Sequence, residues 1–418
     1  MATASSTTTP TPEATPPVRQ NSPVRWARDN LFSSAWNTVL TLVMAPLLAW
    51  VVIRFLRFVF VTARWDIIEA NLTLLMIGLY PRGELSRLWV AVAGMTVAIG
   101  LGAGITAATA RETAIAAGRD VTPGVRDRIQ RAGPPLLLLL VLVVFVRTAL
   151  PILLLAGVVA AGAAAFLLGR RVPARLRGKL NVLAVVGILA ALWSISAFGG
   201  VPRSAWGGLL LTAYYTIGAL LLAFPIGVAL ALGRRSTLPA VRVGCGIFIE
   251  FFRGSPLIAL LFVGWLILPF FLPPGFPTPN LVTRALIIFT LFTSAYIAEI
   301  VRGGLQSVPR GQREAAQALG LSPWKQTRLV ILPQALRSVI PALVGQAISL
   351  FKDTTLVLII GQLELLGAAQ ATTQQERFLG QGYIIEVLVF ISLIYWVGSY
   401  WMSRESQRLE TRLGVGTR

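Results

Sequence analysis

Long apolar stretches separated by short polar segments dominate this chain. Each stretch approaches the roughly 20 apolar residues that an α-helix needs to cross the hydrocarbon core of a bilayer. The pattern therefore predicts an all-α polytopic membrane protein with about ten transmembrane helices. The predicted spans cover residues 35–54, 88–109, 134–148, 150–169, 180–199, 207–232, 245–272, 281–301, 338–361 and 383–402.

Composition agrees with this pattern. Hydrophobic residues make up 55% of the 418 residues and charged residues only 13%, with a mean hydropathy of +0.73, whereas a soluble domain contains about 25% charged residues. The chain has no histidine and one cysteine, Cys245, which excludes histidine-based catalysis, a histidine metal site and a disulfide within the chain. We therefore expect neither catalytic residues nor a metal site.

The net charge is +20, which in a soluble protein would suggest a nucleic acid partner. Here the basic residues flank apolar stretches, and such clusters favour the cytoplasmic side of a membrane. The clusters before the third span and after the fourth both belong in the cytoplasm, which favours two crossings between them. Both termini are then predicted to be cytoplasmic, and no nucleic acid partner is expected.

The arginines around residues 55–87 are the exception, because this topology places them outside. Residues 67–80 are too short to cross the bilayer, and we expect them to form an amphipathic helix on the outer surface.

Four regions are predicted along the chain. Residues 1–30, which begin with a segment rich in Ser, Thr and Pro, are expected to be a disordered cytoplasmic tail rather than a cleaved signal peptide. Residues 31–200 form an N-terminal transmembrane region with additional spans, and residues 406–418 form a second cytoplasmic tail. Residues 203–405 hold nearly every charge inside a predicted span, so function is expected there.

Residues 314–337 form a polar, helix-forming loop between very apolar stretches. Residues 312–319 predict a helix, and Gly320 is placed to end it in a left-handed conformation. Pro323 suits the first position of a second helix, which Ser322 can cap. We expect two short helices joined by a tight turn on the cytoplasmic face. Such a unit suits docking into another protein, but a helix pair that only lies at the membrane interface fits the same pattern.

The same loop resembles the EAA signature of the inner-membrane permease subunits of ABC importers. Gly320 and Leu332-Pro333 follow Glu314-Ala315-Ala316 at the spacing of that signature, with Val330 where isoleucine is usual. In that family the loop is a coupling helix that sits in a cleft of the ATP-hydrolysing subunit. The resemblance implies ATPase-coupling roles for Glu314, Ala315, Ala316, Gly320, Pro323 and Pro333.

Three further segments, residues 248–257, 294–304 and 351–361, resemble signatures of the polar amino acid branch of this family. From about residue 203 to 409 the chain is most similar to general L-amino acid permease subunits of the AapM/BztC type. The resemblance implies a five-helix type I ABC importer permease core (MetI-like) in the C-terminal half. It also implies a bacterial inner-membrane permease for polar L-amino acids that couples to ATPase subunits through residues 310–333.

Charged residues inside the predicted spans indicate a transport path. Lys352 and Asp353 lie about 18 Å along the ninth span, where an unpaired charge costs several kcal/mol, so both must face protein or water. The polar start of the sixth span, residues 212–216, either lines such a path or anchors the helix at the membrane interface.

Two more charged pairs, Glu250 with Arg253 and Glu299 with Arg302, are each spaced three residues apart and so share a helical face. A zwitterionic amino acid needs both a cation and an anion or carbonyl group, which such pairs could supply. Structural ion pairs fit the same spacing equally well. The candidates for the substrate path are Glu250, Arg253, Lys352, Asp353 and Thr354.

No segment of the form G-x-x-x-x-G-K-[ST] occurs, so ATP and Mg are expected to be bound by a partner ATPase and not by this chain. The expected partners are a homologous permease subunit, two ABC ATPase subunits, a periplasmic solute-binding protein, membrane lipid and an L-amino acid. A stand-alone secondary transporter or channel is the main alternative, but it leaves the loop at residues 310–333 unexplained. An integral membrane enzyme would need a nucleophile, base or metal cluster, for which the sequence shows no candidate.

Overall fold

The computed structural model describes residues 23–116, 125–146, 148–197 and 199–413. Within these ranges every regular element is a helix, which confirms the all-α prediction. The chain divides into two compact units, Met1–Arg64 and Trp65–Arg418, which are described separately.

The first unit contains a short helix, α1 (Pro23–Leu31), and a long apolar helix, α2 (Ala35–Arg57). The Ser34 hydroxyl caps α2 by accepting a hydrogen bond from the Asn37 N–H at 3.1 Å. A π-helical turn, η1 (Phe58–Thr62), extends this helix, and no residue of α2 is buried. The predicted disordered tail lies outside the described residues up to residue 22, and from residue 23 the chain is helical instead.

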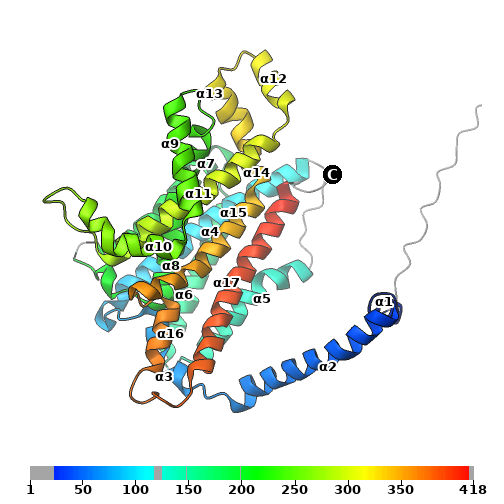
Figure 1. The fold of residues 1–418 in the computed structure, drawn as a ribbon, viewed down its shortest axis with the longest axis vertical. Coiled ribbons are helices and arrows are strands. Elements are labelled where there is room, and N and C mark those ends of the chain that lie inside the picture. Colours follow the sequence, from blue (N-terminus) through cyan, green and yellow to red (C-terminus); the bar gives the residue numbers. More distant parts are fainter. Residues whose placement is uncertain (1–22, 117–124, 147, 198, 414–418) are drawn as a thin grey trace, which may run out of the picture. The chain divides into compact units, whose positions relative to one another are not determined.

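The second unit is a helical bundle (Figure 1). At its centre α8 and α11 pack closely, because a Cβ placed on Gly227 of α8 would lie only 2.6 Å from Ile297 of α11. Fully buried Tyr215 and Phe289 fill the space between these helices. The helices of this unit are α3 (Asp66–Ile77), α4 (Leu85–Ala116), α5 (Val125–Val144), α6 (Ala149–Arg170), α7 (Ala174–Ser194), α8 (Gly208–Gly233), α9 (Pro239–Gly254), α10 (Leu257–Phe262), α11 (Leu281–Ser307), α12 (Arg310–Ala318), α13 (Pro323–Lys325), α14 (Leu332–Ser338), α15 (Ile340–Asp353), α16 (Leu365–Thr373) and α17 (Ile384–Leu413).

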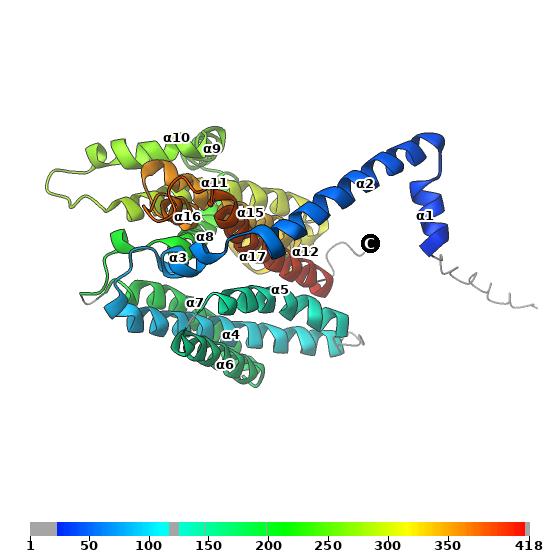
Figure 2. The same cartoon turned by 90° about the horizontal axis from the view of Figure 1, so that it is seen from below.

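Helices α4, α6 and α7 lie together on one side of this bundle (Figure 2). Glycines let α4 and α6 touch along their backbones: a Cβ on Gly104 would lie 2.2 Å from the Phe166 carbonyl oxygen. Arg177 of α7 holds the Glu112 carboxylate of α4 with two bonds, the longer at 2.6 Å. Helix α5 instead packs against α17.

Eight of the described helices are long and apolar enough to cross a membrane, or nine when one bent pair is counted as a span. The predicted span at 245–272 is this pair, Pro239–Gly254 with Leu257–Phe271, and it bends by 104° at the break. Pro256 at the break has no N–H to continue the helix, and it disfavours helical geometry at Ser255. The predicted span at 134–148 falls in α5, whose apolar part is shorter than the roughly 20 residues of a standard crossing.

Helix α3 confirms the helix predicted at residues 67–80 but not its position on the surface. Ile67 and Ile68 are fully buried against α16 and α17, together with Leu365 and Val387. The Asp66 carboxylate also accepts a hydrogen bond from the Tyr383 hydroxyl at 3.1 Å. The apolar face that suggested contact with lipid is therefore covered by protein.

Candidate functional site

The polar loop between α11 and α15 folds as the pattern predicts in its first half. Helix α12 ends at Ala318, and Gly320 two residues later has the left-handed φ of 72°. The Leu321 N–H donates to the Ala316 carbonyl at 3.2 Å, and the Gly320 N–H donates to the Gln317 carbonyl at 2.9 Å. These two bonds form a Schellman motif, which fixes the turn that follows α12.

The second half of the loop differs from the prediction in one detail. Pro323 does open α13, but Ser322 makes no side-chain capping bond. The side-chain amide of Gln326 donates to the Leu321 carbonyl at 2.7 Å and so braces the turn from the other side. A π-helical segment, η6 (Gln326–Ile331), then runs into α14, which has Pro333 in its first turn.

The loop has a buried inner face. Three of its residues are almost fully buried: Ala316 (3% exposed), Ile331 (3%) and Ala335 (0%). Ile331 and Ala335 pack against the C-terminal end of α11. The amide of Gln334 donates to the Gln312 side chain at 3.0 Å and ties α14 to α12. Helices α12 and α14 and the turn between them therefore form one rigid body, named here the coupling unit (residues 310–338).

The outer face of the coupling unit is open. Glu314 and Ala315 are exposed, and Leu319 and Trp324 are 80% and 64% exposed. Exposed large apolar side chains beside a charge are typical of a surface that contacts another protein. Figure 1 shows α12 and α13 at one end of the second unit and α3 and α16 at the other.

A pocket of about 400 Å³ opens at the base of the coupling unit, lined by Arg235, Arg310, Arg313 and Glu314 among others. Arg235 donates to the Leu305 carbonyl at 3.1 Å. Burial lowers the pKa of its guanidinium, and the positive charge of Arg313 lowers it further. This face of the coupling unit therefore carries positive charge beside the exposed glutamate.

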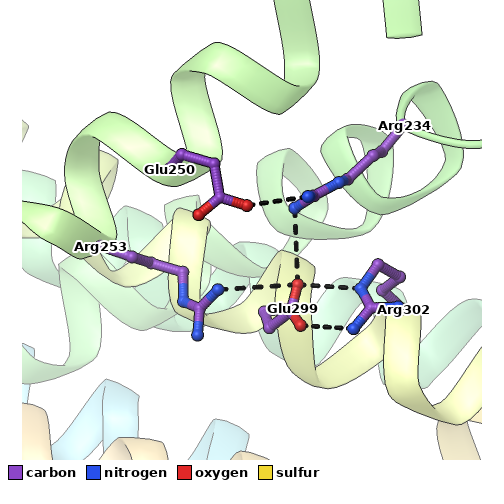
Figure 3. A network of polar contacts seen from close by, with 5 residues as sticks. All are labelled: Arg234, Glu250, Arg253, Glu299 and Arg302. Atoms are coloured by element: carbon purple, nitrogen blue, oxygen red, sulfur yellow. Dashed lines mark hydrogen bonds and ion pairs between the residues drawn. The ribbon is translucent and has the colours of Figure 1, made fainter. Parts of the chain in front are cut away.

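A network of five charged residues joins the end of α8 to α9 and α11 (Figure 3). The predicted Glu299–Arg302 pair is present, with bonds of 2.5 and 2.9 Å. Glu250 instead meets Arg234 at 2.8 Å, and Arg253 lies 3.7 Å from Glu299. Because each carboxylate already holds an arginine, the network is a structural tie between three helices, and substrate contact by Glu250 and Arg253 stays a prediction.

Lys352 and Asp353 lie where α15 ends and a 3-10 segment, η7 (Thr354–Ile360), begins. Lys352 is exposed, Asp353 is partly exposed and Thr354 is fully buried, with its hydroxyl donating to the Phe351 carbonyl at 2.8 Å. The helix type changes from α to 3-10 within one candidate span, directly at these residues. Their role as a substrate path stays a prediction.

The polar start of α8 is not an interfacial anchor. Thr212 and Tyr215 are both fully buried, and the Tyr215 hydroxyl lies 3.4 Å from the Gln362 side chain.

Two residues near Thr212 and Tyr215, namely Glu364 and Tyr395, were not singled out from the sequence. The position of Glu364 between two apolar spans was the signal available in the sequence, since a carboxylate that becomes buried there needs protein partners.

Known proteins resemble this chain at the level of sequence. The sequence model of the binding-protein-dependent transport system inner membrane component family matches residues 223–414. The glutamate/glutamine/aspartate/asparagine transport system permease protein BztC of Rhodobacter capsulatus is 33% identical over 442 residues, which cover 95% of each chain. The chain belongs to this family. It is a multi-span membrane permease of the amino-acid ABC importer kind.

Other relatives match a shorter part of the chain. The inner membrane amino-acid ABC transporter permease protein YhdY of Escherichia coli is 50% identical over 216 residues, 52% of this chain and 58% of that protein. The match thus spans little more than half of YhdY. Among solved structures, an amino acid ABC transporter with histidines is 30% identical and has a TM-score of 0.44 over 49% of this chain and 92% of its own.

Proposed function

We propose that this chain is one permease subunit of an ATP-driven importer for polar L-amino acids in the bacterial inner membrane. A second, homologous permease would share the translocation path. Two ATPase subunits, which bind ATP and Mg, and a periplasmic solute-binding protein would complete the assembly. The substrates in the name of BztC, four polar amino acids, support this substrate class.

The coupling unit is the observation that carries the proposal. It is rigid, because the Gln334–Gln312 hydrogen bond ties α14 to α12 and because its inner face is buried. It presents Glu314, Leu319 and Trp324 to solvent at one end of the second unit. A rigid unit of this kind can transmit the closing motion of an ATPase pair to the flanking helices α11 and α15, whereas a flexible loop would absorb that motion.

The exposure of Lys352 supports a second permease subunit. A lysine at that depth in a span costs several kcal/mol if it faces lipid. In this chain alone its side chain is exposed, and no described carboxylate forms an ion pair with it within 4.0 Å. A partner permease that covers this face of α15 would replace lipid with protein and water and would place the proposed path between the two subunits.

For the topology, we propose that both termini and the coupling unit are cytoplasmic. The basic clusters at residues 111–131 and 170–179 then require that α5 also crosses the membrane. Because the apolar part of α5 is shorter than a standard crossing, this crossing would rely on local thinning of the bilayer.

Uptake in cells tests the proposal. Cells that express this permease with its neighbouring permease, ATPase and binding-protein genes should accumulate radiolabelled L-glutamate, L-glutamine or other polar L-amino acids. Cells with the same set but an ATPase variant unable to hydrolyse ATP should not. Uptake that persists with the inactive ATPase would instead support a secondary transporter that works alone.

A further inference from the structure

A carboxyl group is fully buried at the end of the second unit opposite the coupling unit. Glu364 lies between η7 and α16, outside the candidate spans, and none of its surface is exposed. Its side chain caps α16 by accepting the N–H groups of Leu366 and Gly367, both at 2.8 Å. The Tyr395 hydroxyl of α17 donates to the same carboxylate at 3.2 Å.

The backbone on both sides of Glu364 is bonded to α8, whose start is in turn bonded to α3. The Gly208 N–H at the start of α8 donates to the Leu363 carbonyl at 2.7 Å, and the Leu365 N–H donates to the Thr212 hydroxyl at 3.2 Å. The Gly207 N–H reaches the Ile77 carbonyl at the end of α3 at 3.2 Å. Chain segments far apart in sequence therefore meet around this one carboxyl.

Tyr395 connects the carboxyl to the candidate substrate path. Its hydroxyl interacts with the side chains of Thr354 and Thr212 as well as with Glu364. Its ring packs on Phe351, with centroids 5.0 Å apart. Phe351 and Thr354 flank Lys352 and Asp353 directly in sequence, so a change at Glu364 has a short route to the two charged residues.

Burial raises the pKa of Glu364 to about 7, although its three donors favour the charged form. Among the described residues no cation pairs with it. The titratable groups that act on it are tyrosines, Tyr395 of α17 and Tyr215 of α8, while α3 and η7 contribute none. The carboxyl is therefore placed to change its protonation without a competing charge beside it.

We propose that Glu364 is a positioning residue for the transport path, acting through Tyr395 on Thr354, and that its ionised form holds the path in its substrate-binding arrangement. The inference rests on the proposed function. An ionised carboxylate accepts from all three donors at once, whereas a protonated one carries its own hydrogen on one oxygen and accepts fewer. Protonation therefore loosens the link between α16, α17 and η7.

Binding of radiolabelled L-glutamate and L-glutamine to the purified permease–ATPase complex in nanodiscs, without binding protein, tests this inference. The ionised fraction of a group with a pKa near 7 rises about tenfold between pH 6 and pH 8, so the apparent Kd should fall about tenfold over that range. In Glu364→Gln, whose side chain cannot ionise, the apparent Kd should be independent of pH. The control Glu376→Gln removes an exposed carboxylate of the following loop and should behave as wild type.

Tyr395→Phe provides a second variant that keeps the ring on Phe351. Removal of the hydroxyl takes away one donor that favours the charged form, so the midpoint of the pH profile should move to higher pH. A pH-independent Kd in wild type, the same profile in wild type and Glu364→Gln, or no binding at any pH would each overturn the inference. ATP-dependent uptake with the binding protein present would still support the proposed function in those cases, so the two can fail separately.

Discussion

The two ends of the second unit accommodate their carboxylates in opposite ways. At the coupling end Glu314 is exposed to water, and three arginines surround Glu299. At the other end Glu364 is fully buried, and its partners among the described residues are two backbone N–H groups and one hydroxyl that donate to it. The first arrangement leaves its charges in contact with arginines or water and suits a rigid body that docks. The second suits a group whose charge changes.

Reversal of the exposed charge at the coupling end should have the largest effect. Glu314→Lys adds a cation beside Arg310 and Arg313, and a like-charge contact in a docked interface costs several kcal/mol, where about 1.4 kcal/mol is a factor of ten. We expect ATP-dependent uptake to fall at least about tenfold, with normal amounts of permease in the membrane and less ATPase co-purified. Glu376→Lys at an exposed site elsewhere is the control, and normal transport by Glu314→Lys would refute the coupling role.

Removal of the charge of Lys352 or Asp353, which lie between the two ends, should have the next largest effect on transport. Loss of a charge-assisted hydrogen bond to an amino acid is worth about 1.5–3 kcal/mol, so Lys352→Ala and Asp353→Ala should each weaken amino acid binding about tenfold or more. The nanodisc binding assay measures this directly. If both variants bind with the wild-type Kd, these residues have a structural role only.

The charge network offers a comparison within the coupling end. Glu299→Ala leaves three half-buried arginines without their shared carboxylate and should lower stability by about 1–3 kcal/mol. Glu250→Ala removes a carboxylate that is 61% exposed and should cost less than about 1 kcal/mol. Thermal unfolding of the complex in detergent compares the two, and an equal loss would contradict the central position of Glu299.

Alanine substitutions at two glycines, one near each end, should have the smallest effects and allow the closest comparison of the two ends. Gly320 and Gly361 have φ values of 72° and 77°, and a Cβ added to either would meet no atom of another part of the chain within 4 Å. Alanine at either site should therefore cost about 1 kcal/mol through backbone strain alone. Only Gly320→Ala should also reduce the amount of ATPase that co-purifies with the permease, because its turn orients α12. Equal reduction by both variants would mean that the coupling turn has no special sensitivity.

The helices and their ends could largely be predicted from local chemistry. The turn at Gly320, the first position of Pro323 and the Glu299–Arg302 pair involve residues a few positions apart, and local sequence determines such features. The prediction that the Ser322 side chain caps the second helix was wrong, because the Gln326 side chain bonds to that turn instead.

Features that join distant segments could not be predicted. The burial of α3 depends on α16 and α17, which lie about three hundred residues further along the chain. The partner of Glu250 is Arg234 on another helix, not Arg253 on its own, because the ends of α8 and α9 lie side by side. The bend between α9 and α10 is signalled by Pro256, but no local signal gives its angle of 104°, and both helices pack against α11.

The sequence by itself determined that this chain is a helical membrane protein and that its polar loop turns at Gly320 and Pro323, since apolar run length, glycine and proline act locally. Its resemblance to ABC importer permeases indicated the function. Only the tertiary structure decided which carboxylates are neutralised by arginines and which is buried with hydrogen-bond donors alone. That distinction depends on which side chains from distant helices come within about 4 Å of one another, and no spacing along the chain specifies it.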